Sequence, residues 1–231
     1  MVLSCDHGSD EIPAEYGNLG MSSAHVEECS SGMDKGAASV FEQLVQELDC
    51  RGIRSRISRL VVDMNRYVDQ DELIPEHWGG KPIPGNRGLS RAARQQRIAR
   101  YHAPYHRALV ELLVACERRH GVAFYFAIHA MAPEFEGEVR DMDFALICNR
   151  GRRWAPPLQA AMAARGFTAT VNEPYSLERD IVRVPAGSEY ERFNDHAVII
   201  EINETRAAEP AARQALRDAI RTTVRAGWAA P

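Results

Sequence analysis

The chain has 231 residues, of which 45% are hydrophobic and 26% are charged. This length and composition suit one α/β domain spanning residues 1–231, with a sizeable core. The formal net charge of −4 gives no electrostatic reason to expect binding to nucleic acid or to an anionic membrane surface. No apolar run approaches 18 residues, and the N-terminus lacks a basic segment followed by an apolar one. We therefore expect a cytoplasmic protein that does not span a membrane.

The five cysteines form no CxxC pair, and an odd number cannot all pair within one chain. They are expected to be reduced thiols, as is typical of cytosolic proteins.

The first predicted elements lie between residues 2 and 66. An apolar run at residues 2–6 predicts a buried strand, which a loop containing glycine and serine follows. Asp34 has the position of an N-cap for a helix that runs to Leu48. The β-branched run at residues 60–62 predicts a second core strand that ends in polar residues.

The middle of the chain is predicted to be a loop followed by a long helix. Residues 75–88 are rich in glycine and proline and predict an irregular loop. Ser90 is expected to cap a helix that runs to about His120, with Gly121 as its stop. Pro104 predicts a kink in this helix or a break into two helices.

Strands and helices alternate in the remainder of the chain. Strands are predicted from residue 122 to His129 and at residues 143–148, 167–171 and 196–204, and helices at about 156–164 and 210–224. This alternation indicates a single α/β domain.

Polar side chains follow the predicted core strands. His7, the pair Asn65 and Arg66, His129 and Glu201 each lie at or just past the carboxyl end of a predicted strand. In open α/β sheets, ligands bind at this edge. The sequence therefore predicts a site that these side chains share.

His102 and His106 are four residues apart on a predicted helix, so they share a face and could chelate a metal. However, no acid lies between them, and Pro104 disturbs the helix there. A pocket-lining role or a hydrogen-bonded role in the core is the favoured interpretation.

Six motifs along the chain resemble the N-formylglutamate amidohydrolase family in type and in order. They are DHGSDEIP, VVDMNR, YHAPYHRAL, AIHAMAPEFEGEVR, NEPYS and IIEINE. The resemblance extends from Val2 to about Arg206, and the family is similar to the zinc carboxypeptidases and aspartoacylases. It implies a zinc-carboxypeptidase-like fold of the phosphorylase/hydrolase type, with a mixed, mostly parallel central sheet flanked by helices.

The resemblance implies one zinc ion, or another divalent metal, held by His7, Asp10 and His129. Two nitrogens, one carboxylate and a position left for water are typical of a catalytic zinc site. The carboxypeptidases usually have Glu where this chain has Asp10, and Glu11 stands beside it as the alternative ligand.

The resemblance also implies roles for other residues. Glu201 matches the glutamate that acts as general base and then general acid. Asn65 and Arg66 resemble a pair that binds the substrate carboxylate, for which the planar fork of arginine is suited. Arg140 is the next candidate for recognising substrate charge, and Tyr175 is expected to lie over the site.

The function that these features predict is hydrolysis of the N-formyl or N-acyl amide of an acidic amino acid, such as N-formyl-L-glutamate. The protein would thus be a metal-dependent hydrolase of non-peptide carbon–nitrogen bonds in amino-acid metabolism. Its partner is a small N-acyl amino acid that bears a carboxylate. Two alternatives remain open: a non-catalytic descendant that binds such a metabolite, and a deacylase of the carboxypeptidase or aspartoacylase type.

Overall fold

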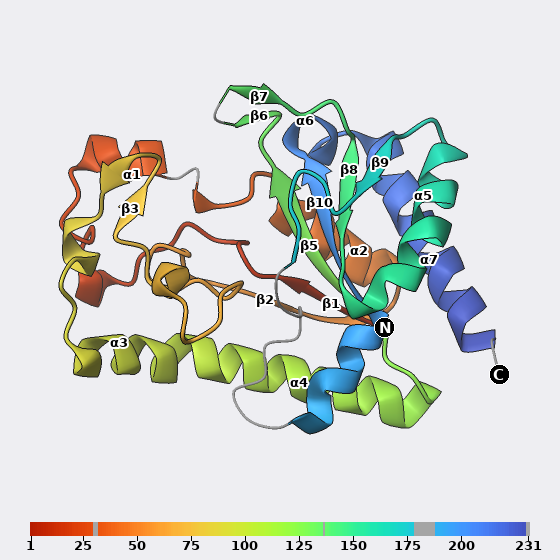
Figure 1. Cartoon of the computed structure of the whole chain (residues 1–231), viewed down its shortest axis with the longest axis horizontal. Coiled ribbons are helices and arrows are strands. Elements are labelled where there is room, and N and C mark those ends of the chain that lie inside the picture. The colour runs from red at the N-terminus through yellow and green to blue at the C-terminus, as the bar shows by residue number, and fades with distance from the viewer. Residues whose placement is uncertain (30–31, 136, 178–187, 230–231) are drawn as a thin grey trace.

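A six-stranded sheet, in the order β2-β1-β5-β10-β8-β9, forms the centre of the computed structural model (Figure 1). The structure describes residues 1–29, 32–135, 137–177 and 188–229. In this sheet, β8 pairs with β10 in the antiparallel direction, and the other four neighbouring pairs are parallel. The predicted mixed, mostly parallel sheet is confirmed. The strands are β1 (Val2–Cys5), β2 (Arg51–Arg54), β5 (Tyr125–Met131), β8 (Phe144–Ile147), β9 (Ala169–Val171) and β10 (Ala197–Asn203).

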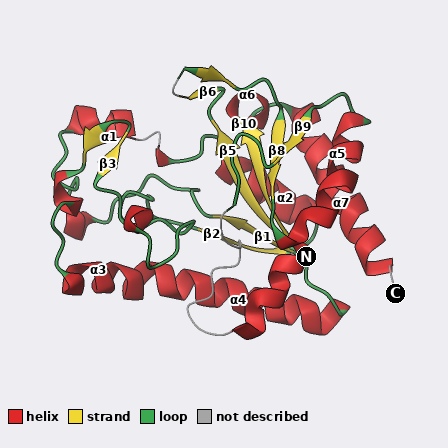
Figure 2. Cartoon of the chain, viewed as in Figure 1, coloured by secondary structure: helices red, strands yellow, loops and turns green. Residues whose placement is uncertain are grey.

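Helices cover both faces of the sheet (Figure 2). On one face, α2, α5 and α7 enclose the largest hydrophobic cluster, which includes Phe126, Ile128 and Ile200. On the other face, Leu109 and Leu113 of α4 pack against alternate residues of the same strands. The helices are α1 (Ser23–Cys29), α2 (Ala37–Glu47), α3 (Arg91–Arg97), α4 (Ala103–His120), α5 (Ala155–Ala163), α6 (Glu204–Ala207) and α7 (Pro210–Ala229).

A second group of segments lies beside the carboxyl end of β1, at the left of Figure 1. It contains α1, the hairpin of β3 (His77–Trp78) and β4 (Lys81–Pro82), and a third hydrophobic cluster. Residues 60–62, predicted to be a strand, belong to this cluster and are buried in turns. That prediction is wrong because these apolar side chains are buried between loops and not in the sheet. The strand that pairs with β1 on the side away from β5 is β2, an edge strand that begins and ends with arginine.

The long predicted helix is divided close to Pro104. Ser90 caps α3 by accepting a hydrogen bond from the amide of Ala93. A π-helical turn, Ile98–His102, then joins α3 to α4, and Pro104 occupies the first turn of α4. Gly121 ends α4 in the left-handed region, with φ of 80°. The predicted break and stop are thus both observed.

Two further structural features bear on the predictions. Among the described residues, none of the helices is sufficiently long and apolar to cross a membrane. Cys5, Cys50, Cys116 and Cys148 are free thiols, while the side chain of Cys29 lies outside the described part of the chain.

Candidate metal centre and active site

Two histidines and one aspartate converge at the carboxyl edge of the sheet. His7 follows β1, His129 lies in β5, and Asp34 lies in the segment that leads into α2. One ligand atom from each residue lies within 4.8 Å of the others, and all three residues are buried. Adjacent parallel strands bring the two histidines together, although 122 positions separate them in the chain.

Asp34 is the centre of this group. Its Oδ2 lies 2.9 Å from Nδ1 of His129 and 3.3 Å from Nδ1 of His7. The same oxygen accepts a hydrogen bond from the amide of Ala130 at 3.3 Å. Sequence analysis predicted Asp34 to be an N-cap, but α2 begins at Ala37, and no side chain caps it. The carboxylate is thus used in the site and not in the helix.

The Nε2 atom of each imidazole forms a hydrogen bond with a further carboxylate, a different one for each histidine. Nε2 of His7 lies 2.7 Å from Oδ1 of Asp63, and Nε2 of His129 lies 3.2 Å from Oδ2 of Asp6. When Nε2 keeps a proton and shares it with this outer carboxylate, Nδ1 is the nitrogen left for a metal to bind. Both rings therefore present Nδ1 toward Asp34.

This donor set fits a divalent metal. Two neutral imidazole nitrogens and one carboxylate oxygen are a composition found in catalytic zinc sites, in which a further position is left for water or substrate. The carboxylates on the outer nitrogens supply the support that metal-binding histidines usually have. His7, Asp34 and His129 could thus hold one ion.

The structure does not bring Asp10 and Glu11 to this group. Both side chains are exposed. Their loop is bonded to the segment that follows β2, because the amide of Ser58 donates to the carbonyl of Glu11 at 2.7 Å, and Ser9 donates to the carbonyl of Arg56. The carboxylate between the histidines is Asp34 instead. No local spacing indicated it, since Asp34 lies 27 positions after His7.

Neighbouring charges and hydrogen bonds shift the pKa values of His129 and Asp34. Burial lowers the pKa of His129, but the hydrogen bonds to Asp34 and Asp6 outweigh burial and raise that pKa to about 10. Burial raises the pKa of the Asp34 carboxyl, but the charge of His7 and the hydrogen bond from His129 bring it well below its usual range.

Glu201 lies beside this centre on β10. It is the register partner of His129 on the adjacent strand, so both side chains point to the same face of the sheet. Burial raises the pKa of Glu201; the charge of His129 lowers it and that of Asp34 raises it, and the net shift is upward. A carboxyl group with a raised pKa is suited to accept and return a proton near neutral pH.

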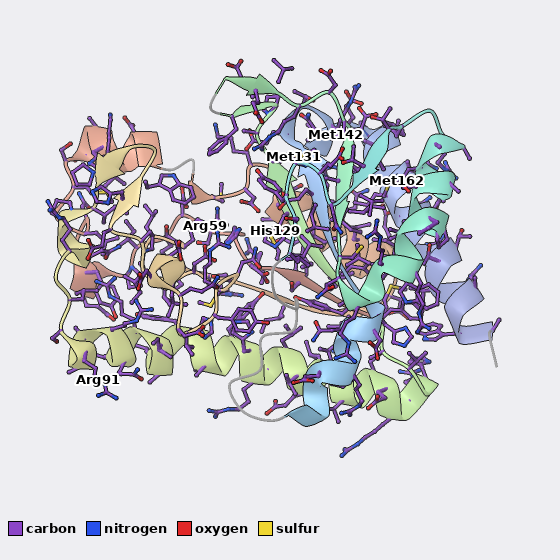
Figure 3. The ribbon with its side chains drawn as sticks, viewed as in Figure 1. Arg59, Arg91, His129, Met131, Met142 and Met162 are labelled. Atoms are coloured by element: carbon purple, nitrogen blue, oxygen red, sulfur yellow. The ribbon has the colours of Figure 1, made fainter. Side chains whose placement is uncertain are left out.

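Arg59 also reaches the centre, although no motif in the sequence indicated it. Its guanidinium contacts both ring nitrogens of His7 and lies 3.4 Å from Oδ2 of Asp63. The group also lies over the ring of Trp78. Figure 3 shows Arg59 in the loop region that faces His129. Its positive charge offsets part of the negative charge of the buried aspartates.

A cavity of about 460 Å³ opens next to these residues, and Glu201 and Arg140 line it. This volume is in the range of small-molecule sites. Arg140 is only 8% exposed, and its guanidinium lies over the rings of Phe135 and Tyr175, 5.1 and 4.9 Å from their centroids. Phe135 belongs to the hairpin of β6 (Glu134–Phe135) and β7 (Glu138–Val139). Among the described residues, no carboxylate forms an ion pair with Arg140.

Asn65 and Arg66 line the same cavity. The amide of Asn65 donates to Asp63 Oδ1 at 2.7 Å, which ties this loop to the support of His7. The buried Asn65 Oδ1 has no hydrogen-bond partner within the described residues. Arg66 donates to the neighbouring carbonyl of Asn65 and forms no ion pair within that same part of the chain. Tyr175, also in the cavity wall, is 39% exposed.

His102 and His106 bind the backbone of this loop. Nε2 of His102 lies 2.9 Å from the carbonyl oxygen of Arg66, and Nε2 of His106 lies 3.0 Å from that of Met64. Both side chains are buried. The favoured interpretation, a hydrogen-bonded role in the core, agrees with these contacts.

A second cavity, of about 380 Å³, lies at the amino end of β5, where Arg192 and Trp154 line it. Arg192 there makes two hydrogen bonds to the carboxylate of Glu117. The histidine–aspartate group and Glu201 adjoin the larger cavity alone, so the chemistry is assigned there.

Known proteins resemble this chain in sequence and in fold. A family model described as N-formylglutamate amidohydrolase matches residues 1–207. The chain is similar to a gene product of Agrobacterium tumefaciens, with 25% identity, a TM-score of 0.82, and 97% of this chain and 90% of that chain covered. It shares its fold with an N-formylglutamate amidohydrolase from Ralstonia eutropha JMP134, with 21% identity, a TM-score of 0.66, and 97% and 91% coverage. No curated protein matches the chain significantly.

Proposed function

Because the chain belongs to the N-formylglutamate amidohydrolase family, we propose that it hydrolyses the N-formyl or N-acyl amide of an acidic amino acid, with N-formyl-L-glutamate as the first candidate. The observation that supports this most directly is the convergence of His7 Nδ1, Asp34 Oδ2 and His129 Nδ1 beside Glu201. These groups are what hydrolysis by a metal and a general base requires.

The proposal assigns one zinc ion, or another divalent metal, to His7, Asp34 and His129. Asp34 replaces Asp10 and Glu11 in this role because it lies within reach of both histidines. When bound, such an ion lowers the pKa of a water molecule and polarises the scissile carbonyl.

Glu201 is the proposed general base. It accepts a proton from the attacking water and returns it to the leaving nitrogen, so that the products are a carboxylate and a free amine. The raised pKa of Glu201 supports this role, since the group must gain and lose a proton within one turnover.

Arg140 is the proposed anchor for the substrate carboxylate. A buried guanidinium without an acidic partner among the described residues favours an anion in the cavity. The two flanking rings limit its rotation, so a planar bidentate contact loses little side-chain entropy. Arg66 and Asn65, which line the same cavity, are the proposed second polar group for the substrate, and Tyr175 is proposed to lie over it.

The proposal is tested by incubating the metal-loaded protein with formyl-, acetyl- and succinyl-amino acids and measuring release of the amine. Acidic N-formyl amino acids are expected to react fastest, and their neutral amide analogues slowly. Binding of these compounds without turnover of any of them would support a metabolite-binding protein instead. Preferential release of a C-terminal residue from peptides would support a carboxypeptidase.

A further inference from the structure

The motif YHAPYHRAL runs from the π-helical turn into the first turns of α4, and its central tyrosine contacts Asp6 beside the metal centre. Tyr105 is buried, and its hydroxyl donates to Oδ1 of Asp6 at 2.6 Å. This distance is short for a hydrogen bond between a hydroxyl and a carboxylate oxygen, as expected for a charged acceptor. None of the roles assigned above to metal, base or substrate binding uses this contact.

The two carboxylate oxygens of Asp6 have different partners. Its Oδ1 accepts hydrogen bonds from Tyr105 and from the hydroxyl of Ser4, the latter at 2.9 Å. Ser4 in turn lies 2.8 Å from the hydroxyl of Tyr125. Oδ2 of Asp6 remains for Nε2 of His129. Donors from β1 and α4 thus fix the plane of this carboxylate.

The orientation of Asp6 determines which nitrogen of His129 can bind a metal. With the proton on Nε2 shared with Asp6, Nδ1 is the nitrogen that faces Asp34 and that would bind the metal. If the Asp6 carboxylate rotated away, the imidazole would lose both its tautomer preference and its ring orientation. Asp63 has this role for His7, and there the backbone amide of Asn65 holds the carboxylate.

We propose that Tyr105 is a positioning residue for the metal centre, which acts through Asp6 to set the tautomer and orientation of His129. The inference rests on the proposed metal site. It assigns the first turns of α4 a role in metal affinity, although no side chain of α4 belongs to the group that could bind the ion.

The test compares Tyr105→Phe with Tyr101→Phe. Tyr101 is the matched control, because its hydroxyl donates to the exposed carboxylate of Glu15, away from the site. Zinc affinity is measured by competition with a chromophoric chelator. Tyr105→Phe is expected to weaken zinc binding by about tenfold or more, the usual effect of losing such a support. Tyr101→Phe is expected to bind as the wild type does. Equal affinity of all three proteins would overturn the inference.

A second variant and a spectroscopic measurement separate positioning from a general loss of structure. Asp6→Asn keeps the side-chain volume and is expected to weaken zinc binding similarly. Adding Tyr105→Phe to it should then change the affinity little, because both act through one carboxylate. The ¹⁵N spectrum of the zinc-loaded wild type should show His129 protonated on Nε2 with Nδ1 bound to zinc. Tyr105→Phe should broaden or shift that Nε2–H signal.

The outcomes distinguish this inference from the proposed function. If the wild type binds zinc and both Tyr105→Phe and Asp6→Asn bind it equally well, the positioning role is wrong while the metal site stands. If the wild type binds no divalent metal, both the assignment of the metal site and the positioning role of Tyr105 are wrong. Additive effects of the two substitutions on zinc affinity would also contradict the inference, since they would show that Tyr105 does not act through Asp6.

Discussion

His129 on β5 and Glu201 on β10 are register partners on adjacent parallel strands, so one pair of strands presents a candidate metal ligand and a candidate general base side by side. Residues in the two strands point alternately to the two faces, and the preceding residues, Ile128 and Ile200, enter the hydrophobic core on the other face. The core packing of the strands therefore also fixes the spacing between ligand and base.

Glu201→Gln should abolish proton transfer while it preserves the site. The amide has the size of the carboxyl group but cannot accept the proton of water, so kcat should fall by about a hundredfold to ten-thousandfold. Metal content and substrate binding should remain. The measurement is steady-state hydrolysis of N-formyl-L-glutamate, with calorimetric binding alongside it. Glu111→Gln, on the exposed face of α4, is the control, and equal activity of the two variants would contradict the assignment.

Arg140→Met should weaken the use of acidic substrates. Loss of a charge-assisted contact to a carboxylate is expected to lower kcat/KM by about 10- to 100-fold. The effect should be much smaller for a substrate whose carboxylates are converted to amides. Arg91→Met is the control, because Arg91 is exposed at the start of α3 and lies far from the site (Figure 3). An equal loss for charged and neutral substrates would argue against carboxylate recognition by Arg140.

Removal of the metal should destabilise the protein. An ion that binds the folded chain at a hundred times its Kd stabilises it by about 2.7 kcal/mol. For a chain of this length, chelation should then lower Tm by about 5–10 °C. Differential scanning calorimetry with and without a chelator measures this change, and added zinc should restore it. The Asp34→Asn variant should show no shift with the chelator, and a shift of wild-type size would contradict its role.

Asp143 provides a test of stability against pH outside the site. Its Oδ2 accepts from the amide of Thr168 at 2.7 Å, and its Oδ1 from Arg206 at 2.6 Å. Burial raises its pKa, but these hydrogen bonds and the charge of Arg206 lower it by more. Because the pKa is lower in the folded state, the stabilisation is complete above the unfolded value of about 4 and is lost as the pH falls toward the folded value.

Asp143→Asn should therefore cost about 2 kcal/mol of unfolding free energy at pH 7 and progressively less below about pH 4. Urea unfolding at several pH values measures the difference from the wild type. Asp141→Asn, on the exposed neighbour two residues away, should show little difference at any pH. A cost for Asp143→Asn that does not change with pH would contradict this account.

The central strands were predictable from the sequence because each is a continuous apolar run. β5, β8 and β10 are almost wholly buried, and their hydrophobic patterns have no competing interpretation. β2 was missed because it lies at the sheet edge and carries two arginines. The run at residues 60–62 was assigned to the sheet because burial between loops leaves the same apolar pattern as burial in a strand.

The site was predictable where its residues lie on these strands or in the motif that follows β1. His7, His129 and Glu201 all adjoin one cavity. Asp34 was not predictable, because its role depends on contacts with His129, 95 positions away, and nothing in the local sequence records them. Asp10 satisfies the spacing expected of a ligand, but the hydrogen bonds of its loop to residues 56–58 turn it to the surface. Arg59 reaches the site in the same way as Asp34, through tertiary structure alone.

The most direct test of the metal centre is the bound-metal content of purified wild-type, Asp34→Asn and Asp10→Asn proteins, measured by mass spectrometry after equilibration with a limited supply of zinc. The account predicts about one zinc per chain in the wild type and in Asp10→Asn, and little or none in Asp34→Asn. Full zinc content in Asp34→Asn, or loss of zinc in Asp10→Asn, would contradict the assignment of His7, Asp34 and His129 as the ligands.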